Sequence, residues 1–370
     1  MDQDSQINVP QRRRLLSLDV MRGLIMILLA GESCALYHNI QQATGPNWIT
    51  NQFFHHPWHG LRFWDLVQPA FMLIAGSAMY ISWFFKVNKG VSWWDNLPHI
   101  LKRCFGLFLF GVALHCVYSG KLVWELWNVL TQLSITTLIA YLIIRKPFIW
   151  QLAFSLLLLV ITELIYRFIN VPGFDMAFTE HHNFGAYADT LLMGKINTDG
   201  WVTINFIPTA AHTIWGALAG RLLVSSLNQV GKVKVLTFAG LIALIAGYSI
   251  DLLSITPIIK RIGTSSFVLV SGGWVLLMMA FLYWLNDIKQ YGKYAWVFTV
   301  VGMNPIFIYL FFETVGVQWF NGLVRIFIGG GMEVAGIQGN SIAVVSSLVT
   351  LFLEWYLCFW LYKRQIFFKL

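Results

Sequence analysis

The stretch Phe54-His55-His56-Pro57-Trp58-His59-Gly60-Leu61-Arg62-Phe63-Trp64-Asp65 separates two long apolar segments near the start of the chain. It continues as Asp65-Leu66-Val67-Gln68-Pro69 into the second of those segments. Imidazole acts as a base or a nucleophile near neutral pH. A turn with three histidines between two apolar segments therefore predicts a reactive group at a membrane surface.

The rest of the chain has the composition of an integral membrane protein. Of 370 residues, 57% are hydrophobic and 11% are charged, whereas about 25% are charged in a soluble domain. A helix needs roughly 20 apolar residues to cross a bilayer. Ten such runs lie at about 15–38, 61–85, 99–118, 125–144, 148–169, 201–224, 235–253, 265–285, 294–316 and 341–362. The sequence predicts an all-α, polytopic transmembrane helical bundle of about ten spans.

The distribution of basic residues predicts the orientation. With the amino terminus inside, 17 of the 25 Lys and Arg residues fall on the cytoplasmic side, 7 fall on the outer side, and Arg22 lies within the first span. Cytoplasmic loops carry such an excess, so we expect both termini to be cytoplasmic and the His55 turn to face the periplasm or a lumen. Lys260-Arg261 is the one adjacent basic pair on the outer side.

No internal repeat or low-complexity linker divides the chain. We expect a single transmembrane domain over 1–370, with a cytoplasmic tail at 1–14 that contains Arg12-Arg13-Arg14. The longest connection, 170–200, is predicted to be an outer loop. The segment 317–340, with its glycine triplet at 329–331, is predicted to be a second outer loop with a re-entrant or interfacial piece.

Several classes of site are disfavoured. The net charge of +8 does not predict nucleic-acid binding, because the basic residues form short clusters between apolar runs. The four cysteines lie in apolar segments without metal-ligand spacing. His55-His56-x-x-His59 lacks a Cys or carboxylate at ligand spacing, apart from Asp65. We therefore expect no metal.

Polar residues within apolar spans need a partner, a water-filled cavity or a function. Asp19 and Arg22 are one turn apart and can pair on one helix face. Glu32 lies deeper in the same span, next to Ser33, and indicates a polar pocket. Later spans add Gln132, His212 and Asn304. A hydrogen-bonded core residue is the favoured reading of His212, and Asn304-Pro305 should break the ninth span.

These residues are similar to those of a known family. Leu16-Ser17-Leu18-Asp19-Val20-Met21-Arg22-Gly23 resembles the opening of multispanning acyltransferases that include the lysosomal heparan-α-glucosaminide N-acetyltransferase and many bacterial relatives. The turn resembles the same family's His-x-x-Trp-x-Gly-Leu-x-x-x-Asp-Leu-x-x-Pro signature, and Phe71 through Gly76 fits its Phe-x-x-x-x-Gly. Weaker matches follow in family order at Lys102-Arg103, Leu130-Thr131-Gln132, Ala186-Tyr187-Ala188-Asp189, Ile207-Pro208, Gly216-x-x-Ala219-Gly220 and Gly302-Met303-Asn304-Pro305 with Tyr309.

The resemblance implies acetyl transfer from cytosolic acetyl-CoA, as co-substrate, to an extracytoplasmic amino sugar of the glucosamine type. The family's active histidine matches His55, which would either carry the acetyl group or deprotonate the acceptor. The family's Asn late in the first span is replaced by Ser33, with Glu32 before it. The family's lumenal amino-terminal domain is not seen, which favours a bacterial inner membrane with the turn facing the periplasm.

The resemblance and the residues together give a candidate site. Asp65 would orient His55, Asn304 would donate to the thioester carbonyl, and Glu32 would hold the sugar or take a proton. Further candidates for substrate or CoA binding are Asp19, Arg22, Ser33, Trp58, Arg103, Gln132, Asp189 and His212. Partners would be acetyl-CoA, a sugar acceptor and the lipid bilayer, and the aromatic faces permit a homodimer.

Three other functions stay open on the sequence alone. The first is O-acyl transfer to a cell-envelope glycan. The second is sugar or proton-coupled transport, since intramembrane Asp, Glu and His residues mark proton relays. The absence of a visible inverted repeat argues against transport. The third is a non-catalytic membrane scaffold.

Overall fold

The computed structural model describes residues 15–368, so the predicted tail 1–14, with Arg12–Arg14, lies outside the described residues. Its helices in chain order are α1 (Leu16–Ser33), α2 (Leu36–Thr44), α3 (Trp48–Asn51), η1 (Phe63–Leu66), α4 (Val67–Val87), α5 (Trp93–Ser119), α6 (Val129–Ile143), α7 (Phe148–Phe168), α8 (Phe184–Met193), η2 (Thr203–Asn205), α9 (Phe206–Val224), α10 (Gln229–Leu252), α11 (Ser265–Tyr283), η3 (Trp284–Ile288), η4 (Gly292–Tyr294), α12 (Ala295–Gly302), α13 (Pro305–Phe311), η5 (Phe312–Phe320), α14 (Asn321–Val334) and α15 (Asn340–Lys363). The all-helical prediction is confirmed: over residues 15–368 the only β pairing is an isolated bridge between His59 and Ile259.

Each predicted apolar range contains helix. Over the described residues, seven helices are long and apolar enough to cross a membrane, or eight if α1 and α2, which meet at a 62° bend, form one span. α6 and α9 are not among these helices, because α6 has only 15 residues and α9 contains Thr209, His212 and Thr213. Ten spans with both termini inside therefore stays a prediction. The predicted break at Asn304-Pro305 is confirmed, since α12 ends at Gly302 and α13 begins at Pro305.

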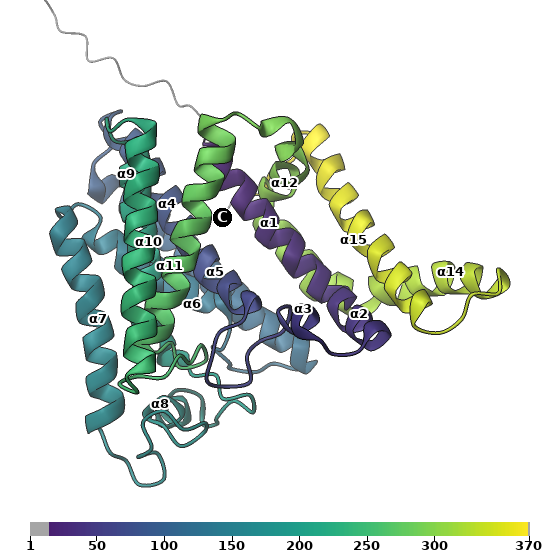
Figure 1. Ribbon diagram of the computed structural model, residues 1–370, viewed down its shortest axis with the longest axis horizontal. Helices are drawn as coiled ribbons and strands as arrows, with labels where there is room; N and C mark the ends of the chain where they lie inside the picture. The colour runs from purple at the N-terminus through teal and green to yellow at the C-terminus, as the bar shows by residue number, and fades with distance from the viewer. Residues whose placement is uncertain (1–14, 369–370) are drawn as a thin grey trace, which may run out of the picture.

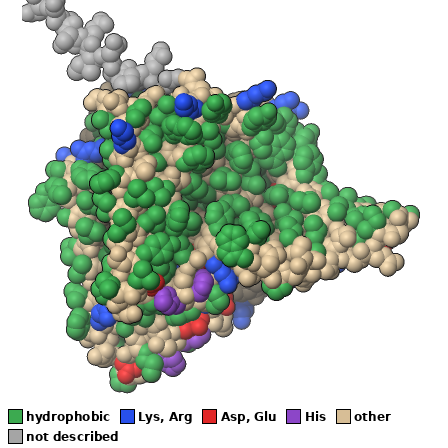
Figure 2. All heavy atoms as spheres, viewed as in Figure 1, with side chains coloured by type: hydrophobic (Ala, Val, Ile, Leu, Met, Phe, Trp, Pro, Cys, Tyr) green, Lys and Arg blue, Asp and Glu red, His purple; other side chains and the backbone are tan. Residues whose placement is uncertain are grey.

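The helices form two groups (Figure 1). α7, α9, α10 and α11 stand side by side, and α1, α12 and α15 pack together on the other side. The central apolar core joins the groups through residues of α1, α4, α9 and α11. Figure 2 shows Lys and Arg side chains along one edge of the bundle and His and acidic side chains gathered at the opposite edge.

The segment 317–340, predicted to be an outer loop with a re-entrant or interfacial piece, contains more helix than a loop would. It is helical through the end of η5 and all of α14 to Val334. α14 extends away from the bundle (Figure 1), and Ile326 and Phe327 are exposed on it. In α14 such apolar residues alternate with Asn321, Arg325 and glycines. This mixture lowers the mean hydropathy of the segment, but the backbone stays helical. Of the other predicted loop, 170–200, residues 184–193 form α8.

Close contact between α4 and α9 depends on two glycines. A Cβ atom at Gly76 would lie 2.0 Å from the carbonyl oxygen of Thr213, and one at Gly216 would lie 2.1 Å from that of Leu73. Small residues permit such backbone approach in membrane bundles. The hydroxyl of Ser77 also donates to the Gly216 carbonyl at 2.8 Å.

Gly76→Ala should therefore push α4 and α9 apart and lower stability by about 1–3 kcal/mol, the usual penalty for overpacking. The thermal midpoint in detergent would report the loss. Gly331→Ala in α14 is the matched control, because its Cβ would meet nothing within 4 Å. Equal midpoints for the two variants would contradict the α4–α9 contact.

Candidate active site

The three-histidine turn is fastened to a distant connection of the chain. Gly60 has a φ of +143°, which favours glycine, and its amide donates to the carbonyl of Ile258 at 2.9 Å. Ile258 belongs to the connection 253–264 between α10 and α11. This link brings Lys260 beside His55, 205 positions earlier in the chain.

Asp65 holds the imidazole of His55. Its Oδ1 lies 2.9 Å from His55 Nδ1. Its Oδ2 accepts the main-chain N–H groups of His56 at 3.2 Å and Arg62 at 2.9 Å. The residue is only 1% exposed. Because two backbone donors fix the carboxylate, it lies where it can orient the ring of His55.

Lys260 is the third member of this cluster. Its Nζ lies 3.1 Å from His55 Nδ1 and 3.6 Å from Asp65 Oδ1, and it lies over the ring of Trp201. Nδ1 can donate its proton to Asp65 or accept one from Lys260, but not both. Donation to Asp65 also leaves the Lys260 ammonium beside the carboxylate. In that state the unprotonated nitrogen of His55 is Nε2.

Burial and charge keep His55 neutral. Burial, followed by the positive charge of Lys260, lowers the pKa of His55 to about 4, against the opposing effect of Asp65. Burial lowers the pKa of Lys260 to about 8, while Asp65 acts to raise it. The His55 side chain keeps 35% of its surface open. A neutral, accessible imidazole can act as a base or as a nucleophile.

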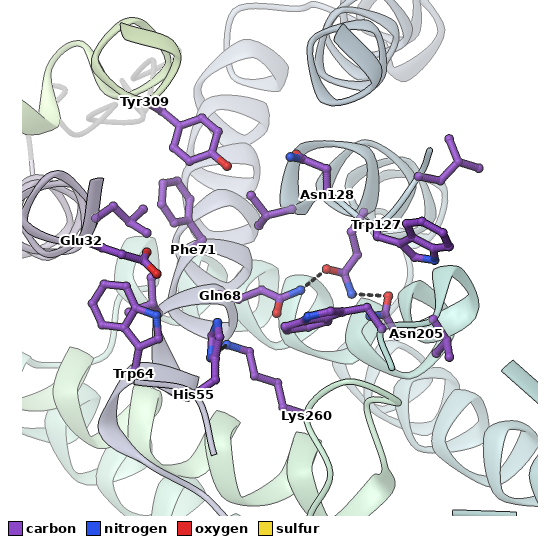
Figure 3. A pocket seen from close by; sticks show the side chains of 17 residues that line it. Glu32, His55, Trp64, Gln68, Phe71, Trp127, Asn128, Asn205, Lys260 and Tyr309 are labelled. Carbon is purple, nitrogen blue, oxygen red and sulfur yellow. Dashed lines mark hydrogen bonds between the residues drawn. The ribbon is translucent and has the colours of Figure 1, made fainter. Parts of the chain in front are cut away.

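His55 opens onto a cavity of about 280 Å³ (Figure 3). Its lining residues come from the ends of several helices and from the connections between them. They are Leu29, Glu32, His55, Trp64, Val67, Gln68, Phe71, Leu126, Trp127, Asn128, Val129, Gln132, Trp201, Val202, Asn205, Lys260 and Tyr309. The predicted site residues Glu32 and Gln132 are thus brought together with His55.

A chain of amides forms one wall of the cavity. Gln68 Nε2 donates to Gln132 Oε1. Gln132 Nε2 in turn donates to Asn205 Oδ1 at 2.7 Å (Figure 3). The same nitrogen donates to Thr209 Oγ1 at 2.9 Å. These bonds link α4, α6 and the start of α9, so the polar wall has a fixed geometry.

A second cavity, of about 350 Å³, adjoins the first. Phe71, Val129 and Tyr309 line both. The second cavity is otherwise lined by His99, Arg103, Leu107, Leu130, Leu133, Pro305, Ile306 and Phe368. The predicted residue Arg103 therefore lies in a largely apolar space next to the His55 cavity, on the side that the charge distribution predicts to be cytoplasmic.

Two predicted residues lie around the outer connections. Trp58 donates from Nε1 to the Phe178 carbonyl at 2.9 Å, outside the cavity lining. Asp189 Oδ2 accepts from Trp127 Nε1 at 2.7 Å, and its Oδ1 accepts from the Thr203 amide at 3.0 Å. Asp189 thus holds Trp127, a wall residue, and does not itself line the cavity.

Three predicted residues of α1 line neither cavity. Asp19 and Arg22 approach to 3.6 Å, and Arg22 also donates to the Gly302 carbonyl at 3.3 Å, which ties α1 to α12. Ser33 donates to the Phe312 carbonyl at 2.8 Å. The position matched to the family's Asn is therefore turned to a neighbouring helix, while Glu32 faces the cavity.

His212 and Asn304 also line neither cavity, although Asn304 adjoins Pro305 of the second one. His212 is fully buried, and its Nε2 lies 3.1 Å from the Val268 carbonyl, as in a core histidine. The side chain of Asn304 donates from Nδ2 to the Ile366 carbonyl and accepts at Oδ1 from the main-chain N–H of Phe368, both at 2.9 Å. It ties the end of the chain to the break between α12 and α13 and does not point at His55.

The histidines of the turn have separate partners. His55 faces Asp65, and His59 Nε2 lies 2.7 Å from Asp251 Oδ1. His56 packs against Gly60. Over residues 15–368, no group of three or more His, Cys, Asp or Glu side chains is placed to hold a metal ion.

Sequence reasoning did not propose Lys260 as a site residue. Its signal is nevertheless present, because Lys260-Arg261 is the one adjacent basic pair on the predicted outer side. Both cations have carboxylate partners: Lys260 lies near Asp65, and Arg261 lies 3.1 Å from Glu180. Basic residues are expected mainly on the cytoplasmic side. This basic pair on the predicted outer side thus marked two residues that have carboxylates close by.

Comparison with known proteins gives the following similarities. The family described as heparan-alpha-glucosaminide N-acetyltransferase, catalytic, matches residues 14–255. The mouse (Mus musculus) heparan-alpha-glucosaminide N-acetyltransferase is 24% identical over 430 residues, which cover 96% of this chain and 60% of the mouse protein. The human (Homo sapiens) protein of that name is 31% identical over 130 residues, 33% of this chain and 18% of the human protein. The chain thus spans 60% of the length of the mouse relative.

Proposed function

Since this chain belongs to the family of heparan-alpha-glucosaminide N-acetyltransferase catalytic regions, we propose that it is a transmembrane acetyltransferase that uses acetyl-CoA and acetylates an amino sugar on the far side of the membrane. The observation that carries the proposal is the neutral, accessible His55, fixed by Asp65, at a cavity that adjoins a second cavity containing Arg103. We place the protein in a bacterial inner membrane with the turn facing the periplasm.

The two cavities suit the shape and chemistry of acetyl-CoA. The apolar second cavity accepts the pantetheine arm, and Arg103 and His99 offer positive or hydrogen-bonding groups to the phosphates. The arm passes between Phe71 and Tyr309, which line both cavities. The thioester then meets His55 in the polar cavity, where the acceptor enters from the opposite side.

His55 acts by one of two routes, and Asp65 serves both. In the first, Nε2 attacks the thioester carbon, the C–S bond breaks, and the acetyl group is carried on the imidazole to the amine. In the second, Nε2 takes a proton from the acceptor amine, which attacks the thioester directly. In either route Asp65 accepts the Nδ1 proton in a hydrogen bond and stabilises the charge that develops on the ring.

Ligand-dependent thermal stability tests the proposal. Acetyl-CoA and CoA should raise the thermal midpoint of the detergent-solubilised protein, because a ligand that binds only the folded state stabilises it by RT ln(1 + [L]/Kd). Arg103→Gln should weaken this effect by roughly 10-fold in Kd, the usual loss when one charge-assisted bond is removed. The absence of any CoA-dependent shift in the wild type, together with no labelled acetyl sugar as product, would sink the proposal.

The pH dependence of the reaction reports the state of His55. With a pKa of about 4, His55 remains a free base as the pH falls, until the pH passes through that value. At saturating amino sugar, kcat/KM for acetyl-CoA should stay level between about pH 7 and 5.5, where an unperturbed histidine with a pKa of about 6.5 would be protonated. Lys260→Met removes a positive charge beside the ring and should move the acid limb upward. An acid limb near pH 6.5 in the wild type would contradict this electrostatic account.

A further inference from the structure

Glu32 is the carboxylate that faces the His55 cavity. It lies near the end of α1, is exposed, and lines the cavity. In Figure 3 its carboxylate points into the space beside Trp64, toward Gln68. Its neighbour Ser33 points instead to the Phe312 carbonyl. The first span thus supplies a single anionic side chain to the cavity.

The charges around the reacting histidine do not cancel. Lys260 directs its ammonium at His55 and Asp65, 3.1 Å and 3.6 Å away. With His55 neutral, the carboxylates of Glu32 and Asp65 exceed this single ammonium by one negative charge. The charge of Lys260 also acts on Glu32, but its salt bridge is to Asp65, so Glu32 keeps no ion-pair partner in the cavity. This favours a ligand with one positive charge.

The surrounding ionic groups do not neutralise this excess. Arg261 lies 3.1 Å from Glu180, and Arg62 donates to a main-chain carbonyl of the turn at 2.9 Å; neither lines the cavity. The other carboxylate that acts on Glu32 is Glu313, which lines neither cavity and adds negative charge. Glu32 in the cavity and Glu313 outside its lining thus both favour the binding of a cation.

We propose that Glu32 binds the ammonium group of the acceptor and is the residue by which the site favours a primary amine over a hydroxyl group. This inference rests on the proposed acetyl transfer and deepens it by naming the residue that selects the acceptor's amine. A neutral hydroxyl would leave Glu32 unpaired, whereas an ammonium would form a charge-assisted hydrogen bond with it.

The step balances in atoms and charge. The ammonium R–NH3⁺ gives one proton to the Glu32 carboxylate and becomes R–NH2. Its nitrogen then forms a bond to the acetyl carbon, and the bond from that carbon to the CoA sulfur is broken, directly or through the His55 acyl intermediate. The second amine proton passes by way of His55 to the thiolate. The products are the amide R–NH–COCH3, CoA–SH and protonated Glu32.

A pair of acceptors that differ in one group tests the proposal. Glucosamine and glucose differ at one carbon, which bears an amine in the first and a hydroxyl in the second. In Glu32→Gln, kcat/KM for glucosamine should fall by roughly 10- to 100-fold, the effect of losing a charge-assisted bond, while the KM for acetyl-CoA stays constant. Glu32→Asp keeps the charge and should retain the preference for glucosamine. Glu333→Gln is the matched control, since Glu333 is exposed on α14 and lines neither cavity.

Direct binding of glucosamine without CoA separates this inference from the proposed function. Wild-type protein that binds glucosamine, with binding lost in Glu32→Gln, supports the amine site even if no acetyl transfer is detected. Equal glucosamine binding by wild type and Glu32→Gln, or an unchanged ratio of glucosamine to glucose turnover, would overturn it. Absence of CoA binding in the wild type counts against the proposed function alone.

Discussion

His55→Ala should abolish acetyl transfer to glucosamine-type acceptors and leave the bundle folded. Removal of a general base lowers kcat by about 10²–10⁴-fold, and removal of an acyl carrier eliminates the covalent route altogether. The side chain lies in a turn and is 35% exposed, so its loss should change the thermal midpoint little. Turnover of labelled acetyl-CoA into acetylated sugar is the measurement.

His59→Ala is the matched control for this experiment, because it makes the same change four positions later. His59 pairs with Asp251, is 56% exposed, and does not line the cavity. Its variant should keep nearly full activity. Undiminished turnover in His55→Ala would remove His55 from the mechanism. A base-labile acetyl-enzyme in quenched wild-type protein would select the covalent route over direct attack.

Asp65→Asn should produce the second large loss. The asparagine side chain cannot stabilise the positive charge that develops on the His55 ring, and it can hold that ring in the wrong tautomer. The same change in another aspartate–histidine pair lowers kcat by about 10⁴-fold. It also leaves Lys260, 8% exposed at its side chain, without its carboxylate. Stability should fall by roughly 3–5 kcal/mol, as when one partner of a buried pair is removed.

A double variant separates the two consequences of this change. Adding Lys260→Met to Asp65→Asn removes the unpaired cation and should recover much of the thermal midpoint. Activity should stay low, because His55 still lacks its anionic partner. Wild-type kcat in Asp65→Asn, or recovery of activity along with stability in the double variant, would show that Asp65 serves folding rather than the reaction.

The fold could be predicted from hydropathy because each span is a local property of the sequence. Apolar runs located the helices, and Asn304-Pro305 located a break, since a proline removes a backbone hydrogen bond and often breaks or kinks a helix. The helix of 317–340 was missed because glycines 329–331 resemble a loop, whereas the helical backbone accommodates them in α14. The 62° bend between α1 and α2 has no such local signal.

Local sequence predicted the pair at the centre of the site, and polar residues within apolar spans marked two further lining residues, Glu32 and Gln132. His55 and Asp65 are ten positions apart and lie in one turn, so their pairing could be anticipated. The Lys260 contact joins residues 205 positions apart and depends on how the 253–264 connection packs against that turn. Likewise, no spacing rule distinguishes Glu32, which faces the cavity, from the adjacent Ser33, or the buried His212 from a ligand-binding histidine.

The central claim is that the thioester of acetyl-CoA reaches His55 through the two adjoining cavities. Electron cryomicroscopy of the protein with bound CoA tests it most directly. We expect density for the phosphates near Arg103, density for the pantetheine arm between Phe71 and Tyr309, and the thiol within reach of His55 Nε2. CoA bound on another face of the bundle, or an arm that stops short of Phe71 and Tyr309, would contradict the account.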